Sequence, residues 1–439
     1  MQKRTLTLSE SIMVGLMLFA LFLGAGNIIF PPYLGQLAGN NIVPAITGFL
    51  LTGVGLPLLG ILAIAKAGGD LQTIAGRVNP IFGIFFTSIV YLTIGPFFGI
   101  PRTATVSFEI GVAPFLPSNL SSSFWPLLTF TIIFFIVTIL FSLNPTKLVD
   151  RIGKILTPIL ILVIGLLAIK SIITPMGEIE EPVGNYNTDA FFNSFLQGYL
   201  TMDAIAALVF GIVIIESIRA KGVIDQRNIL KTTAFAGIIA ASGLALVYLS
   251  LSYIGVTSVS AIGLQDNGGT IIALASRVLF GEMGGVILAA AILFACLSTS
   301  IGLVAATAQF SHKIYPKISY VSYVMAYAGF STLIANIGLT QLIAVSLPVL
   351  LAIYPIAIVL VILSFFDRSF DRKPLVYVIA LTLTGIISIF DGLRSAGISF
   401  NNVDKVFSVL PLFEQGIGWF VPAIAGTLLG MAIVRFKRQ

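Results

Sequence analysis

The chain has 439 residues, of which 57% are hydrophobic and only 10% are charged, and its formal net charge is +6. Soluble domains carry about 25% charged residues, so this composition excludes a soluble globular protein and predicts an integral membrane protein embedded in a lipid bilayer. The basic residues lie in short loops between apolar segments rather than on one polar face, which argues against a nucleic-acid partner.

Apolar segments recur along the whole chain, and a helix that crosses a bilayer takes about 20 residues. They predict an all-α protein with twelve transmembrane helices, at roughly 11–35, 42–66, 81–113, 124–142, 152–173, 191–218, 229–257, 284–311, 319–336, 341–365, 375–397 and 414–435. No linker separates these segments, so residues 1–439 form a single predicted transmembrane domain. The connecting segments 174–190 and 258–283 are long enough to form short extracellular helices that cap a cavity.

The charges of the loops predict the orientation. If the N-terminus is cytoplasmic, most of the 24 Lys and Arg residues fall in cytoplasmic segments, whereas outer loops carry acids such as Glu178 and Glu180. Cytoplasmic loops of membrane proteins are enriched in Lys and Arg. The pattern therefore predicts that both termini lie in the cytoplasm, which requires an even number of spans.

The first predicted span is broken in its middle by Gly24-Ala25-Gly26-Asn27, and Pro31-Pro32 follow a turn later. A helix in lipid must satisfy its own backbone, so such a break is tolerated only where the freed N–H and C=O groups face protein, water or a solute. In secondary transporters, breaks of this kind form the substrate and ion site. Close helix packing through Gly24 and Gly26 is the alternative explanation.

The third predicted span, 81–113, is unusually long, and Gly95-Pro96 and Ile100-Pro101 supply kink points. It also carries two charges, Arg102 and Glu109, seven residues apart on one helix face. Seven residues advance ~10 Å along a helix axis, so the two side chains can hardly reach each other to form a direct ion pair. We expect each to meet another span at the outer end of the pathway, as a structural pair or a gate rather than as a substrate contact.

Two later spans carry polar residues near their middle, at 198–203 in the sixth and at 295–300 in the eighth. Span six starts five spans after span one and enters from the opposite side, as in an inverted repeat. The predicted repeats are 8–173 and 191–365, and helices in 375–435 are additional. Ser and Thr in the eighth span can also simply bond back to carbonyls of their own helix.

Asp203 is the sharpest single candidate, because a carboxylate at the bilayer centre costs at least ~2.5–3.5 kcal/mol and should face a partner. It could bind an ammonium group, an ion or a proton, or it could cap the restart of its helix. No phosphate-binding loop is present, and a single histidine leaves no metal-protease or Ser-His-Asp set. The chain is therefore predicted not to be an enzyme.

Three runs of sequence resemble signatures of one bacterial family, the branched-chain amino acid carriers known as BrnQ or LIVCS. They are LFLGAGNIIFPP at 21–32, GIPRTATVSFE at 99–109 and GYLTMDA at 198–204. The resemblance implies uptake of leucine, isoleucine and valine across a bacterial plasma membrane, usually coupled to Na⁺. It also implies membership of the amino acid–polyamine–cation superfamily and a LeuT-like fold, with five-helix inverted repeats and two further C-terminal helices.

The same resemblance implies a Na⁺ site made by the carbonyls of Ala20, Leu23 and Ala295 and the hydroxyls of Ser298 and Thr299. Sodium-coupled members of the wider LeuT-like fold have Ala-x-x-Thr-Ser at these positions. Here the serine comes first and the threonine second, at Ser298 and Thr299. Both hydroxyls supply the oxygen ligands that a hard cation takes.

The implied substrate site places the amino acid carboxylate near Gly24, Ala25 and Gly26, and the amino group near Leu200, Thr201 and Asp203. Better-known relatives have small neutral residues where this chain has Asp203. A second Na⁺ site that uses Asn27 and Thr201 therefore stays open.

The hypothesis that results is a Na⁺-coupled symporter that works by alternating access, with spans one, two, six and seven rocking against three, four, eight and nine. The nearest alternative is H⁺ coupling, with Asp203 as the proton acceptor. A channel or an intramembrane enzyme is a more distant alternative, and no catalytic residue set supports the enzyme.

Overall fold

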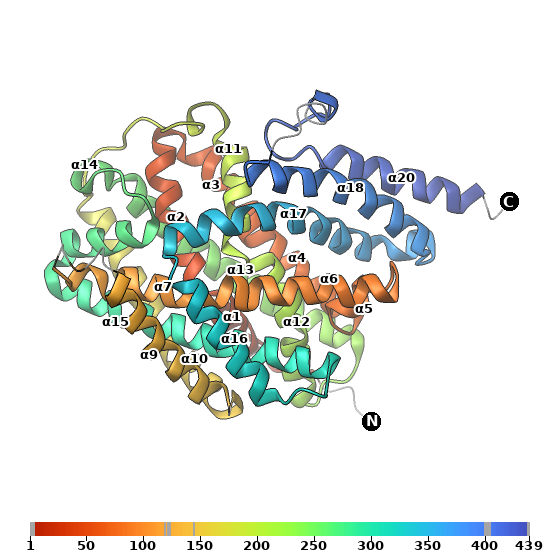
Figure 1. Cartoon of the computed structure of the whole chain (residues 1–439), viewed down its shortest axis with the longest axis horizontal. Helices are drawn as coiled ribbons and strands as arrows, with labels where there is room; N and C mark the ends of the chain where they lie inside the picture. The colour runs from red at the N-terminus through yellow and green to blue at the C-terminus, as the bar shows by residue number, and fades with distance from the viewer. Residues whose placement is uncertain (1–4, 118–119, 121–123, 144, 399–404, 437–439) are drawn as a thin grey trace.

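The computed structural model describes residues 5–117, 120, 124–143, 145–398 and 405–436, and the regular structure in these ranges is entirely helical (Figure 1). The first half comprises α1 (Leu8–Phe22), α2 (Ala25–Ala38), η1 (Gly39–Asn41), α3 (Ile42–Leu50), η2 (Leu51–Gly55), α4 (Leu56–Ala67), α5 (Leu71–Ala75), α6 (Pro80–Leu92), η3 (Thr93–Phe97), α7 (Gly99–Gly111), η4 (Ala113–Phe115), α9 (Phe124–Ser142) and α10 (Pro145–Ile173). The second half comprises α11 (Tyr186–Gln197), η5 (Gly198–Thr201), α12 (Asp203–Ala220), α13 (Gln226–Val256), α14 (Val259–Ile262), α15 (Gly268–Ile314), α16 (Tyr320–Ala335), α17 (Leu339–Phe366), η6 (Asp367–Phe370), α18 (Pro374–Ser395) and α20 (Phe420–Phe436). The all-α prediction is confirmed for the described residues.

Within the described ranges, eight helices are long and apolar enough to cross a membrane, and four apolar helices are shorter. The four shorter helices, Leu8–Phe22, Pro158–Ile173, Tyr320–Ala335 and Phe420–Phe436, account for the difference from the predicted twelve spans. The helices also divide differently from the predicted spans. In the run Ala25–Ala67, for example, α2 continues through η1 into α3 without a loop. Gly39 turns the chain there with a positive φ of 46°, which its missing side chain allows. A Cβ at this position would lie 2.3 Å from the Glu180 carbonyl oxygen.

The break in the first span is confirmed. α1 begins with a capping box between Thr7 and Glu10 and ends at Phe22, and the chain is extended at Gly24 before α2 starts. Pro31 and Pro32 lie inside α2 rather than ending it. Because proline has no N–H, the carbonyls four residues earlier in α2 lose their helical partners, which lengthens the stretch of unsatisfied backbone beyond the break.

The break in the sixth span is also confirmed, and it is sharper than its sequence alone indicates. α11 tightens into the 3₁₀ turn η5, and Met202 then takes a left-handed conformation with φ 65° before α12 starts at Asp203. A positive φ is rare for a residue with a long side chain and stores backbone strain of order 1–3 kcal/mol. Strain of this kind is typical of functional sites.

Two further predicted irregularities lie where the sequence placed them. Gly95 departs from helical geometry within η3, so the long third span divides into α6 and α7, with Pro101 in the first turn of α7. In the predicted outer segment 258–283, α14 forms one short helix, and Gly281 interrupts α15 with a φ of 66°. This segment is therefore helical except at 258 and 263–267, whereas the other predicted outer segment, 174–190, is helical only from Tyr186.

The helices pack so that both broken segments lie inside the molecule. α2 packs between α13 and α15, α12 packs on α4, and α7 lies along α15. α17, α18 and α20 lie side by side and form one flank of the molecule, coloured blue in Figure 1. The inverted repeats at 8–173 and 191–365 stay a prediction.

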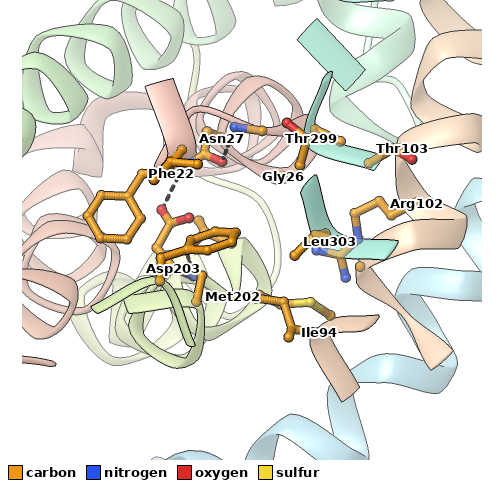
Figure 2. A pocket seen from close by; sticks show the side chains of 17 residues that line it. Phe22, Gly26, Asn27, Ile94, Arg102, Thr103, Met202, Asp203, Thr299 and Leu303 are labelled. Atoms are coloured by element: carbon orange, nitrogen blue, oxygen red, sulfur yellow. Dashed lines mark hydrogen bonds between the residues drawn. The ribbon is translucent and has the colours of Figure 1, made fainter. Parts of the chain in front are cut away.

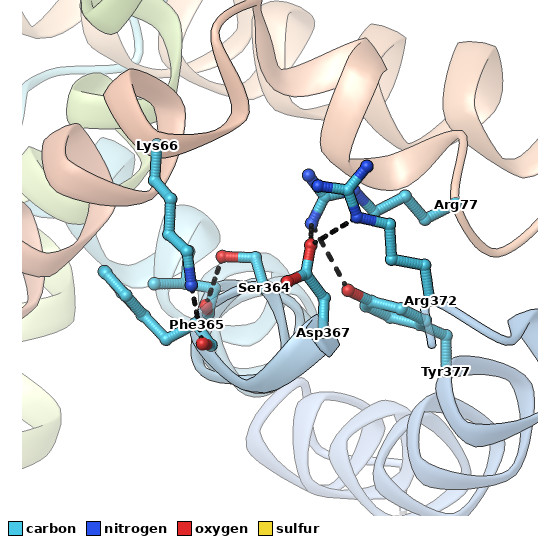
Figure 3. Close-up of polar contacts among 8 residues, drawn as sticks. Lys66, Arg77, Ser364, Phe365, Asp367, Arg372 and Tyr377 are labelled. Atoms are coloured by element: carbon cyan, nitrogen blue, oxygen red, sulfur yellow. Dashed lines mark hydrogen bonds and ion pairs between the residues drawn. The ribbon is translucent and has the colours of Figure 1, made fainter. Parts of the chain in front are cut away.

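A polar cluster ties this flank to the rest of the molecule where α4 and α17 end (Figure 3). The Lys66 ammonium donates to the Phe365 carbonyl at 2.6 Å. Arg77 and Arg372 both pair with the carboxylate of Asp367, at 2.8 Å and 3.3 Å. Two cations around one buried carboxylate satisfy a charge that burial would otherwise make costly.

A second ionic contact lies nearby, in the turn between α4 and α5. The Asp70 carboxylate accepts hydrogen bonds from the backbone N–H and the hydroxyl of Thr73, and it pairs with the Lys313 ammonium at 3.2 Å. Burial raises the pKa of Asp70, but these hydrogen bonds and the Lys313 charge outweigh burial and hold the pKa below its ordinary value.

Candidate functional site

The two helix breaks meet at one internal cavity of about 50 Å³ (Figure 2). Its walls come from the α1–α2 break, η3 and α7, the η5–α12 break, and α15. Seven of the predicted site residues line it: Gly24, Ala25, Gly26, Asn27, Thr201, Asp203 and Thr299. Five do not: Ala20, Leu23, Leu200, Ala295 and Ser298. Phe22, Ile94, Met202, Phe210 and Leu303 make much of the remaining wall apolar.

A buried hydrogen-bond network joins the two breaks directly. The Asn27 amide donates to the Asp203 carboxylate at 2.6 Å, and the Tyr248 hydroxyl donates to the same oxygen at 2.5 Å. Asn27 also donates to the Tyr248 oxygen. All three side chains are at most 2% exposed. The carboxylate therefore links helices that lie far apart in the sequence.

This network separates the two interpretations of Asp203 that the sequence left open. Its side chain accepts from Asn27 and Tyr248, which belong to other helices, rather than from N–H groups at the start of its own helix. The backbone N–H of Asp203 is instead capped by the Thr201 hydroxyl at 3.4 Å, and that hydroxyl donates to Gly198. The carboxylate therefore joins the two breaks rather than capping its own helix.

Gly24 does not offer a free N–H to a substrate, contrary to the expectation. Its N–H donates to the Asn27 side-chain oxygen at 3.0 Å, which caps the start of α2. The N–H groups of Ala25 and Gly26 lie in the first turn of α2, where a helix has no internal acceptors. The Asn27 side chain thus donates its amide N–H to Asp203 and accepts the Gly24 N–H with its amide oxygen.

The predicted cation ligands are brought together only in part. Thr299 lies against the first break, since a Cβ on Gly24 would be 3.4 Å from the Thr299 methyl carbon. Both hydroxyls of the eighth span, Ser298 and Thr299, donate back to the Ala295 carbonyl, at 2.8 Å and 3.0 Å. This is the bonding that the structural interpretation predicted. Each hydroxyl oxygen keeps its lone pairs while it donates, so this bonding does not prevent either oxygen from ligating a cation.

Arg102 meets other spans, as expected, but it lines the cavity at the two helix breaks rather than the outer end of the pathway. Its guanidinium donates to the carbonyl of Leu200 in η5 and to the Ser346 hydroxyl in α17, at 3.3 Å for the latter. Its position follows from the kink at Gly95, after which the chain restarts as α7 and Arg102 falls in the first turn of this new helix.

A second cavity, of about 210 Å³, lies near the first one. Phe30 and Leu200 line it, as do Asp266 and Asn267 from the segment 258–283 and Gln197 from the end of α11. The predicted capping segment does therefore border a cavity. The Phe30 ring stacks on the Arg102 guanidinium at 5.3 Å, so these residues form the layer between the two cavities.

Tyr248 is the functional candidate that the sequence did not reveal. It lies in α13, among apolar residues that contain no glycine–proline break near it, and tyrosine is common in membrane helices. The one feature of the sequence that could have indicated Tyr248 is its hydroxyl group, which lies in the middle of a long apolar span. Only the packing of α13 against α2 shows that it reaches Asp203.

Comparison with known proteins gives a consistent result. A family model described as branched-chain amino acid transport protein matches residues 7–437. The branched-chain amino acid permease BraB of Bacillus subtilis (strain 168) is 49% identical over 438 residues, covering 99% of this chain and 97% of the relative.

Two solved structures are similar to the whole chain. Mhp1, a nucleobase-cation-symport-1 family transporter in a closed conformation with bromovinylhydantoin bound, has a TM-score of 0.63 at 12% identity, covering 97% of this chain and 92% of that one. MhsT in complex with L-phenylalanine has a TM-score of 0.55 at 16% identity, covering 96% of this chain and 98% of that one. At these identities the two structures show the fold alone.

Proposed function

Since this chain belongs to the branched-chain amino acid transport protein family, we propose that it is a secondary symporter that imports leucine, isoleucine and valine together with Na⁺. The observation that carries the proposal is the meeting of two broken helices at one cavity, joined by the hydrogen bond from Asn27 to Asp203. Paired breaks of this kind hold substrate and ion at mid-membrane in secondary transporters. Catalytic residue sets play no part in this function.

The proposed substrate site uses both breaks. Ala25 and Gly26, at the positive end of α2, face the carboxylate of the amino acid, while Gly24 shapes the turn. Asp203 and Thr201, which line the cavity, face the ammonium group, and the backbone of Leu200 next to Thr201 is a further candidate. The apolar part of the cavity wall suits an aliphatic side chain.

The cavity must widen before it can admit such a substrate. Its volume of about 50 Å³ is well below the ~300–1,000 Å³ of typical ligand pockets. Alternating access supplies this change if the helices at the breaks move against α6, α7 and α15. The cavity of about 210 Å³ beyond Phe30 then serves as the outer approach.

The proposed Na⁺ site lies between the end of α1 and the eighth span. The carbonyls of Ala20 and Leu23 lie in or next to the last turn of α1, where carbonyls lack helical partners. Ala295, Ser298 and Thr299 supply the remaining oxygens, and Asn27 is a further candidate through its amide oxygen. The contact between Thr299 and Gly24 supports this placement.

The proposed setting is a bacterial plasma membrane with both termini in the cytoplasm, as the loop charges predict. Extracellular amino acid then enters from the side of Asp266 and Asn267. Substituted-cysteine labelling from each side of the membrane tests this orientation directly.

Coupling to H⁺ is the second candidate, and a specific observation favours it. Asp203 is buried, and among the described residues no cation lies within ion-pair distance of its carboxylate. Burial without a cation makes the charged form of such a group costly, and uptake of a proton removes that cost.

One experiment separates the two candidates. Leucine uptake is measured in sealed vesicles of the purified protein, with a Na⁺ gradient and a pH gradient imposed separately. We expect the Na⁺ gradient alone to drive accumulation. Uptake driven by pH and indifferent to Na⁺ would replace Na⁺ with H⁺, and absence of any leucine uptake would refute amino acid transport.

A further inference from the structure

Arg102 is a buried cation without a matching anion. Its side chain is 2% exposed, and among the described residues no carboxylate lies within ion-pair distance of it. Its partners are a carbonyl, a hydroxyl at 3.3 Å and the face of the Phe30 ring, all of which are neutral. A buried arginine stays protonated, so its charge carries a large desolvation cost unless an anion pairs with it.

The guanidinium also has unused donor capacity. Its Nε atom is buried and has no hydrogen-bond partner. Nε and Nη2 form one edge of the planar fork, and Nη2 makes only the long contact to Ser346. Two parallel N–H groups on one edge are the arrangement that binds a carboxylate bidentately.

The guanidinium also lies next to the first helix break. A Cβ placed on Gly26 would lie 3.4 Å from Arg102 Nη1, so the guanidinium borders the start of α2. The positive end of that helix and the arginine therefore converge on one wall of the cavity. Figure 2 shows Arg102 and Asp203 on opposite sides of the cavity, with Gly26 and Thr299 above.

We propose that Arg102 binds the carboxylate of the transported amino acid, while Asp203 holds the ammonium group on the other side of the cavity. The pair recognises a zwitterion, and the apolar wall takes the aliphatic side chain. This inference rests on the proposed function and adds a charged residue to a carboxylate site otherwise built from backbone. It predicts that a branched aliphatic compound without a carboxylate charge binds poorly.

The test compares leucine with leucinamide, which keeps the ammonium group and side chain but has no carboxylate charge. Binding to the purified protein in detergent is measured by titration calorimetry. We expect the wild type to bind leucine at least about 30-fold more tightly than leucinamide. Arg102→Gln should weaken leucine binding at least about 30-fold, as for loss of one partner of a buried charge pair, and leave leucinamide within about threefold.

Arg277→Gln is the matched control. Arg277 also donates to a backbone carbonyl, that of Pro114, and stacks on a phenylalanine ring, Phe115, at 5.0 Å, but it does not line the cavity. Its substitution should leave both affinities unchanged. Arg102→Lys keeps the charge without the fork, so its leucine affinity should lie between those of the wild type and Arg102→Gln. This variant decides the question if Arg102→Gln does not fold.

The outcomes are distinguishable. Unchanged leucine affinity in Arg102→Gln, or an equal loss of leucine and leucinamide binding, would overturn the role of Arg102 while leaving amino acid transport intact. A selective loss of leucine binding supports it. A wild-type protein that binds no leucine would instead refute the proposed function itself.

Discussion

Replacing Asp203 by asparagine removes the charge at the centre of the network while keeping its shape. In the structure one carboxylate oxygen accepts from Asn27 at 2.6 Å and from Tyr248 at 2.5 Å. The oxygen of an asparagine amide can accept both bonds, so the link between the two breaks survives. What Asp203→Asn loses is the negative charge that would face the ammonium group of a substrate.

The size of the effect follows from that loss. A hydrogen bond to a charged group contributes about 1.5–3 kcal/mol, and one between neutral groups about 0.5–1.5 kcal/mol. If the ammonium group exchanges its charged partner for a neutral one, its binding weakens by the difference, about 1–1.5 kcal/mol. This corresponds to a rise of roughly 5- to 13-fold in the leucine dissociation constant. Equilibrium binding of radiolabelled leucine to the purified protein at saturating Na⁺ measures it.

Glu109→Gln provides the control for this prediction. Glu109 is another carboxylate of the membrane-embedded helices, in α7, but it does not line the cavity. Its substitution should leave the leucine dissociation constant unchanged. Wild-type affinity in Asp203→Asn, with a normal unfolding temperature, would show that Asp203 only joins the two breaks. The assignment of the ammonium group would then be wrong.

Three further outcomes are expected. Ser298→Ala and Thr299→Ala should each raise the Na⁺ concentration for half-maximal leucine uptake, and an unchanged Na⁺ dependence in both would remove the eighth span from the cation site. Tyr248→Phe should lower the free energy of unfolding in detergent by about 1.5–3 kcal/mol, because the Asp203 carboxylate loses one of its two donors; equal stability would contradict the network. Asp70→Asn should lower the unfolding temperature at pH 7 but progressively less below pH ~4, since a carboxylate with a lowered pKa stabilises the fold only above the pKa of its unfolded form. A difference that persisted at low pH would refute this linkage.

The sequence by itself determined the local features of this protein. The composition required membrane helices, and the glycines at 24 and 26, with the prolines that follow, marked the first break. The segment 198–203 marked the second, and Gly95 marked the kink. These predictions succeeded because the conformational preferences of glycine and proline act within a few residues of the chain.

The tertiary structure alone decided which groups meet. Asn27 and Asp203 are 176 residues apart, and Tyr248 comes from a third helix, so no local pattern could pair them. Arg102 was expected at the outer end of the pathway, but the kink brings it into the cavity. Helix positions in sequence specify which face a side chain occupies, whereas depth and partners depend on how kinked helices pack. In this protein the backbone breaks are local, and the network that joins them is a product of the fold.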